Sequence, residues 1–432
     1  MTRVWQFLTN YSLLLIFGAL IALVWANIDP HGYHHFIETP LWANDLVGAT
    51  YDYWLKAYGD HAEDLIAPGP ERVLSIHYLV NDLLMAFFFA IAGKEVWEAV
   101  ALKSGSLRGK KALSPLVATA GGIAGPMAVY LGIAAVLGST TYDAVANGWA
   151  VPIATDIAFS YLVGRLIFGA GHPAVRFLLL LAIADDAAGL IILAVFYPTG
   201  ELAPAWLLLS FGVAMTVYIL FNWLPRKLDA GRPERPVSSA VEKTLGYLPY
   251  IIGGAICWYG FQESGIHPAL GLLPMVATLP HADEDYGIYA ASETEQRDLL
   301  NRAEHALKSP VEVVLFTFGL TNAGVEFSAI GAATWLVLFG LLIGKPAGIF
   351  LFGWIAAGPM RLGLPDGMRV VDLFLVGCVA AIGFTVSLFI AAVAFEPGPV
   401  QDAAKMGALF SFAAALMSFA AASMIGVVKR DT

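Results

Sequence analysis

Long apolar stretches recur along the chain, and short polar segments that hold most of the charges separate them. A transmembrane helix needs roughly 20 mostly apolar residues, which these stretches reach or approach. We predict twelve helices, at residues 11–27, 74–97, 113–137, 149–168, 174–197, 204–224, 244–260, 265–280, 309–327, 332–356, 371–394 and 405–427. The seventh and eighth are short, and an error there would reverse the direction of every later span.

Composition supports a membrane protein. Of the 432 residues, 58% are hydrophobic and only 13% are charged, about half the charged fraction of a soluble domain. We therefore predict a single all-α polytopic membrane domain over residues 1–432, with the first stretch retained as a helix. Cys257 and Cys378 fall in apolar segments without disulfide or metal-ligand spacing. The basic residues are scattered among loops, so no nucleic-acid partner is expected.

The loop charges predict an orientation. Loops on the cytoplasmic side carry an excess of Lys and Arg. With a cytoplasmic N-terminus, only Lys56, Arg72 and Lys405 of the 24 basic residues fall outside, and Lys345 falls mid-span. Both termini are therefore predicted to be cytoplasmic, and residues 281–308 form a polar inner loop.

The predicted outer segment, residues 28–73, is acidic and rich in aromatic residues. Trp and Tyr favour the interface between membrane and water, so we expect part of this segment to lie on the membrane surface. His31, His34 and His35 could hold a metal ion, but we favour a hydrated interfacial cluster.

Four ionisable residues lie in the middle of predicted spans. Asp185 and Asp186, in "LLLLAIADDAAGLIILAVF", lie about 17 Å into the fifth span at 1.5 Å per residue. Asp156 lies roughly 12 Å into the fourth span, and Lys345 in "LLIGKPAG" reaches a similar depth in the tenth. Three carboxylates and one ammonium are therefore predicted to meet at one level from three helices.

The cost of this cluster argues for a function. Each ionised group at the bilayer centre costs at least about 2.5–3.5 kcal/mol, and a buried salt bridge alone recovers little because desolvation offsets the attraction. The cluster has three acidic side chains and one basic side chain, and this excess of negative charge suits a site that takes up a cation or protons. Adjacent carboxylates cannot both ionise cheaply, and hard cations prefer oxygen ligands. We predict that Asp185 and Asp186 bind Na+ or protons in competition, while Lys345 pairs with an aspartate when the cation is absent.

Two spans contain residues that interrupt helices. "GWAVPIATDIAFS" places Pro152 and Thr155 before Asp156, and "VAAIGFTVSLF" centres on Gly383 and Thr385. Proline frees backbone carbonyl groups. The fourth and eleventh spans are the middle members of the triplets 3–5 and 10–12, which run in opposite directions. This pattern predicts inverted repeats with discontinuous helices 4 and 11. For Gly383 alone, close helix packing is an alternative.

Five motifs resemble the NhaA-type sodium–proton antiporters of bacterial inner membranes, in matching order over nearly the whole chain: "ATDIAFS" (154–160), "LAIADD" (181–186), "NAGV" (322–325), "LLIGKPAGI" (341–349) and "IGFTVSLFIA" (382–391). The resemblance implies a twelve-helix fold and electrogenic, pH-regulated exchange of Na+ or Li+ for protons. It implies that the protein needs no cofactor and that its partners are membrane lipids. A homodimer is possible for proteins of this family.

The resemblance also assigns roles to the mid-membrane residues. Asp186 is implied as the main cation ligand beside Asp185. Thr155 and Asp156 are implied at the helix crossing, and Lys345 as their basic partner.

Further roles implied by the resemblance fall nearer the membrane surfaces. "VNDLLM" suggests that Asp82 lines the cation path. Glu95, Glu304 and His305 match a cytoplasmic pH-responsive region, and His267 in "SGIHPAL" matches at the outer end of the eighth span. The outer segment is longer than is usual in this family.

Two other classes of protein are weighed. An intramembrane aspartyl protease needs two carboxylates that share a proton, but neighbours on one helix do not face each other. Asp156 with Asp186 would form such a pair, although a central lysine would disturb it. A passive cation channel would use rings of like charge along a pore, and one asymmetric site that contains a lysine fits alternating access better.

Overall fold

The computed structural model is mostly helical and describes residues 13–51, 53–54, 71–101, 107, 110–230, 232, 235–280, 299–427 and 429–430. The first half contains α2 (Leu13–Ile28), α3 (Pro30–Glu38), β1 (Pro40–Asn44), β2 (Ala49–Thr50), β3 (Arg72–Ser75), α6 (Ile76–Tyr78), η2 (Leu79–Leu84), α7 (Met85–Ala101), α8 (Lys110–Val136), α9 (Ser139–Val145), η3 (Ala146–Ile153), α10 (Ile157–Phe168) and α11 (Pro173–Phe196). The second half contains α12 (Pro204–Tyr218), η4 (Ile219–Trp223), α13 (Leu224–Leu228), α14 (Pro236–Leu245), α15 (Leu248–Ser264), η5 (Pro268–Leu270), α16 (Leu273–Val276), α17 (Leu299–Asn322), η6 (Phe327–Ala329), α18 (Ala332–Phe339), η7 (Gly340–Gly344), α19 (Lys345–Ala357), α20 (Val370–Ala380), α21 (Thr385–Ala394), α22 (Pro399–Phe410) and α23 (Ala413–Ile425).

The long helices identify a polytopic membrane protein. Among the described residues, six helices are long and apolar enough to cross a membrane, and two bent helix pairs raise the number to eight if each pair is one span. Large apolar side chains such as Leu208, Leu416 and Met424 are exposed by 74–87% on these helices, as expected where lipid replaces water. Twelve spans and inverted repeats remain predictions.

Both predicted helix interruptions are confirmed. The fourth predicted span consists of α9 with η3 and then α10, bent by 53° at Ala154–Asp156. The eleventh consists of α20 and α21, bent by 57°. Pro152, which cannot donate a backbone hydrogen bond, lies in the last turn before the first break.

The eighth predicted span differs from the prediction. Residues 265–280 contain only the three-residue η5 and the four-residue α16 instead of one continuous helix. Gly265 has a left-handed φ of +78°, and Pro268 begins η5. These residues stop α15 and allow only short helical turns after it.

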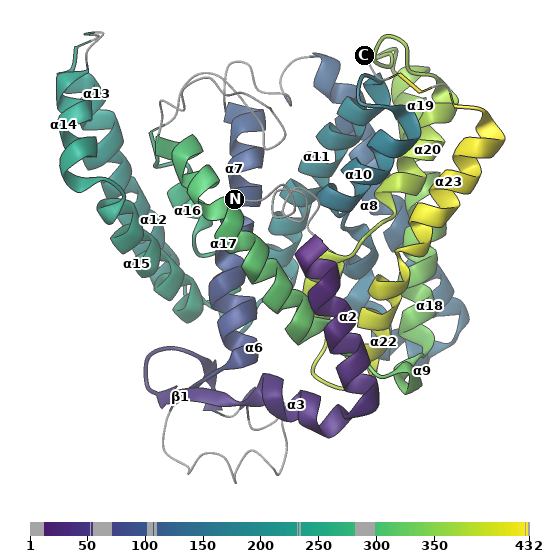
Figure 1. The fold of residues 1–432 in the computed structure, drawn as a ribbon, viewed down its shortest axis with the longest axis horizontal. Helices are drawn as coiled ribbons and strands as arrows, with labels where there is room; N and C mark the ends of the chain where they lie inside the picture. Colours follow the sequence, from purple (N-terminus) through teal and green to yellow (C-terminus); the bar gives the residue numbers. More distant parts are fainter. Residues whose placement is uncertain are drawn as a thin grey trace.

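The predicted outer segment contains a small sheet between α3 and α6, which the predicted all-α fold did not include. β1, β3 and β2 form an antiparallel three-stranded sheet with β3 in the middle, and Ala43 lies opposite Val73. The sheet and α3 lie together at one end of the helices (Figure 1).

The helices form two groups that share a middle layer. α12 and α15 pack as a pair on one side, and α8, α11, α19 and α20 pack together on the other (Figure 1). α7 contacts both α11 and α17, and α17 packs along α2. The bent pairs lie in the second group, which therefore carries the mid-membrane residues.

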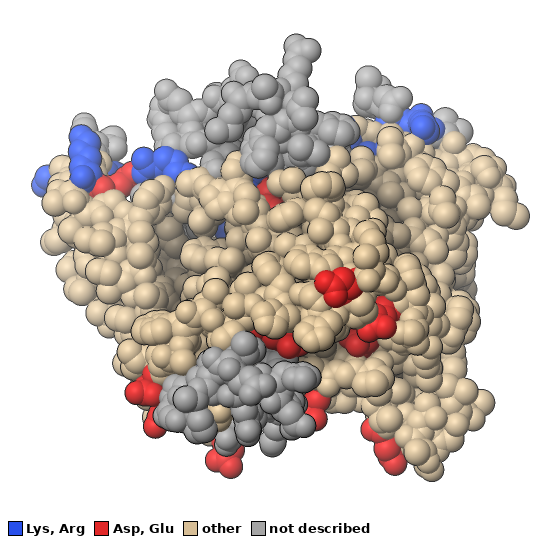
Figure 2. All heavy atoms as spheres, turned by 60° about the horizontal axis from the view of Figure 1, so that its bottom comes forward, with Lys and Arg blue, Asp and Glu red and all other residues tan. Residues whose placement is uncertain are grey.

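The two ends of the molecule differ in charge. Basic residues gather at one end and acidic residues near the other (Figure 2). We call these ends the basic face and the acidic face. The basic face has the exposed residues Arg226, Lys227, Arg235, Lys243, Arg361, Arg369, Lys429 and Arg430, and the acidic face has Asp45, Glu71, Asp143, Glu201 and Glu396.

Candidate functional site

Asp156 joins the two helix breaks. It is the N-cap of α10, where its Oδ1 accepts a hydrogen bond from Phe159 N at 3.3 Å. Its Oδ2 accepts from Thr385 N at 3.2 Å and from Thr385 Oγ1 at 2.5 Å, at the first residue of α21. One buried carboxylate therefore caps the N-termini of two helices, whose partial positive charges stabilise it.

Two serine hydroxyl groups connect the two bent helix pairs, and each pair supplies one donor and one acceptor. Ser160 Oγ of α10 donates to Val379 O at 3.0 Å, and Ser387 Oγ of α21 donates to Val151 O at 2.7 Å. A Cβ at Gly383 would lie 2.8 Å from Ala154 O. The glycine therefore serves close approach at the break, which agrees with both the helix-interruption and the packing interpretations.

Asp185 is bound on one oxygen by two partners. Thr155 Oγ1 donates to Asp185 Oδ2 at 2.6 Å, and Lys345 Nζ lies 3.0 Å from the same oxygen. Lys345 Nζ also donates to Ile153 O, at the end of η3. Asp185 is 1% exposed, and its buried Oδ1 has no hydrogen-bond partner among the described residues. The predicted pairing of Lys345 with an aspartate therefore involves Asp185.

Asp186 is less constrained than its neighbour. The structure gives it no hydrogen bond or ion pair with the described residues, although the charges of Asp185, Asp156, Lys345 and Glu95 act on it. Asp185 and Asp186 line a cavity of about 20 Å³ together with Phe88, Phe89 and Phe389. We call it the inner cavity. It has room for about one water molecule, and both carboxylates border it.

Small residues place Lys345 at this depth. Gly121 and Gly125 of α8 face Gly344 and Gly348 on η7 and α19, so closely that a Cβ at Gly348 would lie 2.0 Å from Gly121 O. Such four-residue spacing of small residues lets helices in a membrane approach closely. The π-helix η7 directly precedes Lys345, and π turns often occur at functional sites.

Asp82 and His267 meet in a second cavity that opens on the acidic face. His267 Nε2 lies 3.7 Å from Asp82 Oδ1, and Trp258 Nε1 donates to Asp82 O at 2.8 Å. His267 Nδ1 accepts from Ala269 N, so the proton of a neutral ring lies on Nε2 and faces Asp82. This cavity, the outer cavity, measures about 400 Å³, and exposed Glu201 is among its lining residues.

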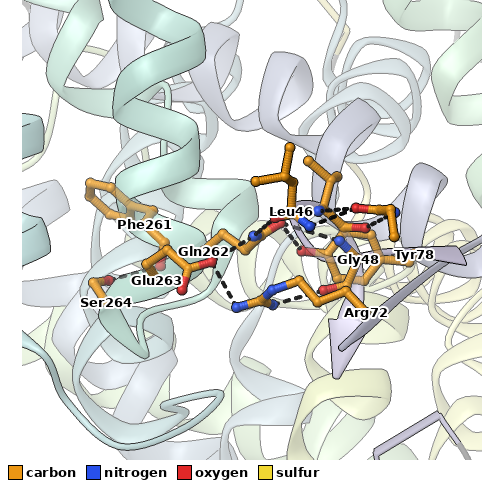
Figure 3. Close-up of polar contacts among 10 residues, drawn as sticks. Leu46, Gly48, Arg72, Tyr78, Phe261, Gln262, Glu263 and Ser264 are labelled. Carbon is orange, nitrogen blue, oxygen red and sulfur yellow. Dashed lines mark hydrogen bonds and ion pairs between the residues drawn. The ribbon is translucent and has the colours of Figure 1, made fainter. Parts of the chain in front are cut away.

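A polar network forms one wall of the outer cavity and ties the sheet to the end of α15 (Figure 3). Gln262 Nε2 donates to Leu46 O at 2.7 Å, and Tyr78 Oη donates to Gln262 Oε1 at 3.0 Å. Arg72 Nη2 pairs with Glu263 Oε1 at 2.7 Å, and Arg72 Nη1 donates to Gly48 O at 3.0 Å.

The remaining predicted residues lie nearer the basic face. Glu95 is half-buried on α7, beside the buried ion pair of Lys94 Nζ and Glu98 Oε2 at 2.7 Å. Glu304 and His305 lie in the first turns of α17, but their side chains lie outside the described residues.

The histidine cluster lies on α3 at the acidic face. His34 Nδ1 lies 3.8 Å from Glu38 Oε1. Burial lowers the pKa of His34 and raises the pKa of Glu38 from 4.5 to about 7. Within the described residues, no group of three His, Cys, Asp or Glu side chains could hold a metal ion.

Several site residues were missed by the sequence predictions. The reciprocal serines, Gln262 and Glu263 carry no motif of their own. The close helix packing at the glycines could have been predicted, because the sequence shows the four-residue spacing of small residues at Gly121, Gly125, Gly344 and Gly348.

Comparisons with known proteins cover nearly the whole chain. The chain matches the family described as Na+/H+ antiporter 1 over residues 3–424. It is 67% identical over 431 residues to the Na(+)/H(+) antiporter NhaA of Jannaschia sp. (strain CCS1), covering all of both chains. It is 42% identical to the protein of that name from Desulfitobacterium hafniense (strain DSM 10664 / DCB-2), over 99% of this chain and 97% of the relative.

Proposed function

Because the chain belongs to the Na+/H+ antiporter 1 family, we propose that it exchanges Na+ or Li+ for protons at Asp185 and Asp186. The main support for this proposal is that the two carboxylates have different hydrogen-bond and ion-pair partners. Asp185 has an ammonium and a hydroxyl partner, whereas Asp186 borders the inner cavity without such partners among the described residues. Asp186 is then the first ligand for a cation or proton.

The exchange follows from charge. In the empty site, Asp186 holds a proton and the Lys345 ammonium neutralises Asp185. When Na+ binds both carboxylates, Asp186 releases its proton and displaced Lys345 releases a second one. Two protons leave for one Na+, so each cycle moves net charge and is electrogenic. Because protons and Na+ compete for the same oxygens, exchange slows at low pH.

The neighbouring residues receive supporting roles. Thr155 and Asp156 hold the crossing, with Gly383 and Thr385 at the second break. Asp82 and His267 form the acidic-face end of the ion path. Glu95 acts on Asp186 from the side of the basic face, where we place pH control together with Glu304 and His305.

We further propose twelve spans with inverted repeats, and cytoplasmic termini on the basic face. The reciprocal serine bonds between the two bent pairs support a two-fold relation. The positive-inside rule supports the orientation. Reaction of single cysteines in the loops with impermeant reagents would test both.

The alternatives find less support. Asp185 is paired with Lys345 and Asp156 caps two helices, so neither is placed to share a proton as in a protease dyad. A channel would move ions without displacing protons from the protein.

Two measurements test the proposal. Everted vesicles with an internal pH gradient should show dequenching of a pH dye on addition of Na+ or Li+, but not K+, over a pH series. Asp186→Asn should abolish the response, because an amide cannot exchange a proton for a cation. Asp372→Asn is the control, since this buried carboxylate caps α20 away from the site. Retained exchange in D186N, or calorimetric Na+ binding without proton release, would refute the mechanism.

A further inference from the structure

One helix of a bent pair borders both cavities. Val386, Phe389 and Ile390 of α21 line the inner cavity, and Ala392 and Val393 line the outer cavity. Among the described residues, the two cavities share no lining side chain. A short barrier within α21 and its neighbours therefore separates the mid-membrane carboxylates from the cavity on the acidic face.

The Phe389 ring fills this barrier. The side chain is 0% exposed, and its ring centroid lies 4.9 Å from that of Phe89 and 5.0 Å from that of His267, at 71° and 61°. Phe89 lines the inner cavity, and His267 lines the outer one. The ring centroid of Phe318 on α17 lies 6.3 Å from that of Phe389. Edge-to-face contacts of this kind favour a defined ring position.

We propose that Phe389 is a gate residue, whose ring closes the inner cavity toward the outer cavity and must move before an ion passes between them. An apolar constriction excludes water and therefore a hydrated cation. The identity of the ion rests on the proposed function, but the presence of the barrier does not.

Cysteine accessibility tests the gate without transport. In a cysteine-free background (C257A/C378A), Leu190→Cys places one thiol on the wall of the inner cavity. Intact cells are treated with trimethylammonium-ethyl methanethiosulfonate, a cationic reagent that does not cross membranes, and mass spectrometry of the purified protein gives the rate. Adding Phe389→Ala should accelerate labelling at least about tenfold, which corresponds to about 1.4 kcal/mol of barrier. Phe389→Met, which refills the space, should keep labelling slow.

Controls separate gating from misfolding. Val393→Cys in the outer cavity should react at the same rate with and without the F389A substitution, which reports an intact acidic face. Phe177→Ala removes another fully buried ring that lines neither cavity, and it should leave the Leu190→Cys rate unchanged. Unchanged Leu190→Cys labelling in F389A, or equal acceleration by F177A, overturns the gate. Because labelling needs no sodium, this result stands apart from the D186N transport assay.

Discussion

The ion pair between Lys345 and Asp185 makes a prediction about stability. Both side chains are 0% exposed, and Lys345 Nζ lies 3.0 Å from Asp185 Oδ2. Lys345→Met keeps the apolar stem and removes the charge, which leaves a buried carboxylate with Thr155 as its donor. Removing one member of a buried pair costs roughly 3–5 kcal/mol. We expect a loss of that size in the free energy of unfolding.

The second substitution decides whether the ion pair is the cause. In K345M/D185N neither charge remains, and Thr155 can still donate to the amide oxygen, so the stability should return close to the wild-type value. Equilibrium unfolding of the purified variants in mixed detergent micelles measures both. Lys405→Met is the matched control. Lys405 is 7% exposed and makes no ion pair with the described residues, so its loss should cost little. Equal destabilisation of K345M and K345M/D185N would refute the reasoning.

Three further predictions concern the stability of the protein outside the mid-membrane carboxylates. Gly348→Ala should cost roughly 1–3 kcal/mol in micelle unfolding because its Cβ would meet Gly121 O, whereas Gly132→Ala, with open space around it, should not. Gln262→Leu should cost roughly 1–3 kcal/mol by breaking the network to the sheet, and Glu263→Gln, which removes the charge of a partly exposed pair, about 0.2–1 kcal/mol; equal losses would contradict this order. Because Glu38 holds its proton more tightly when folded, stability should fall as pH rises from 4.5 to about 7, and Glu38→Gln should flatten that part of the unfolding profile.

The apolar pattern predicted the long helices because the bilayer fixes their length. α11 was expected at 174–197 and occupies Pro173–Phe196. The two breaks were predictable as well, since Pro152 and Gly383 disturb helices wherever they occur. The single helix predicted at 265–280 is wrong because Gly265 and Pro268 stop a helix even within an apolar segment.

Side-chain partners were less predictable than helix positions. Adjacent residues on a helix point about 100° apart, so the spacing of Asp185 and Asp186 cannot tell which of them faces Lys345. The sheet was missed for a related reason. β1 and β3 lie far apart in sequence, and no two-residue Asn-Gly or Asp-Gly turn announces their pairing. Contacts between distant segments depend on the packed fold, which local patterns do not specify.

The charges of the site account for the net charge that the proposed exchange moves. Lys345 offsets Asp185. Asp156 accepts bonds from the N-termini of α10 and α21, and two helix termini supply roughly half a positive charge each. One carboxylate, Asp186, is therefore left without an internal counter-charge, so one proton completes the neutrality of the empty site. In the proposed Na+-bound state both aspartates are ionised and Lys345 is neutral, so the site carries one net negative charge. The proposed exchange of two protons for one Na+ therefore changes the charge of the site by one unit.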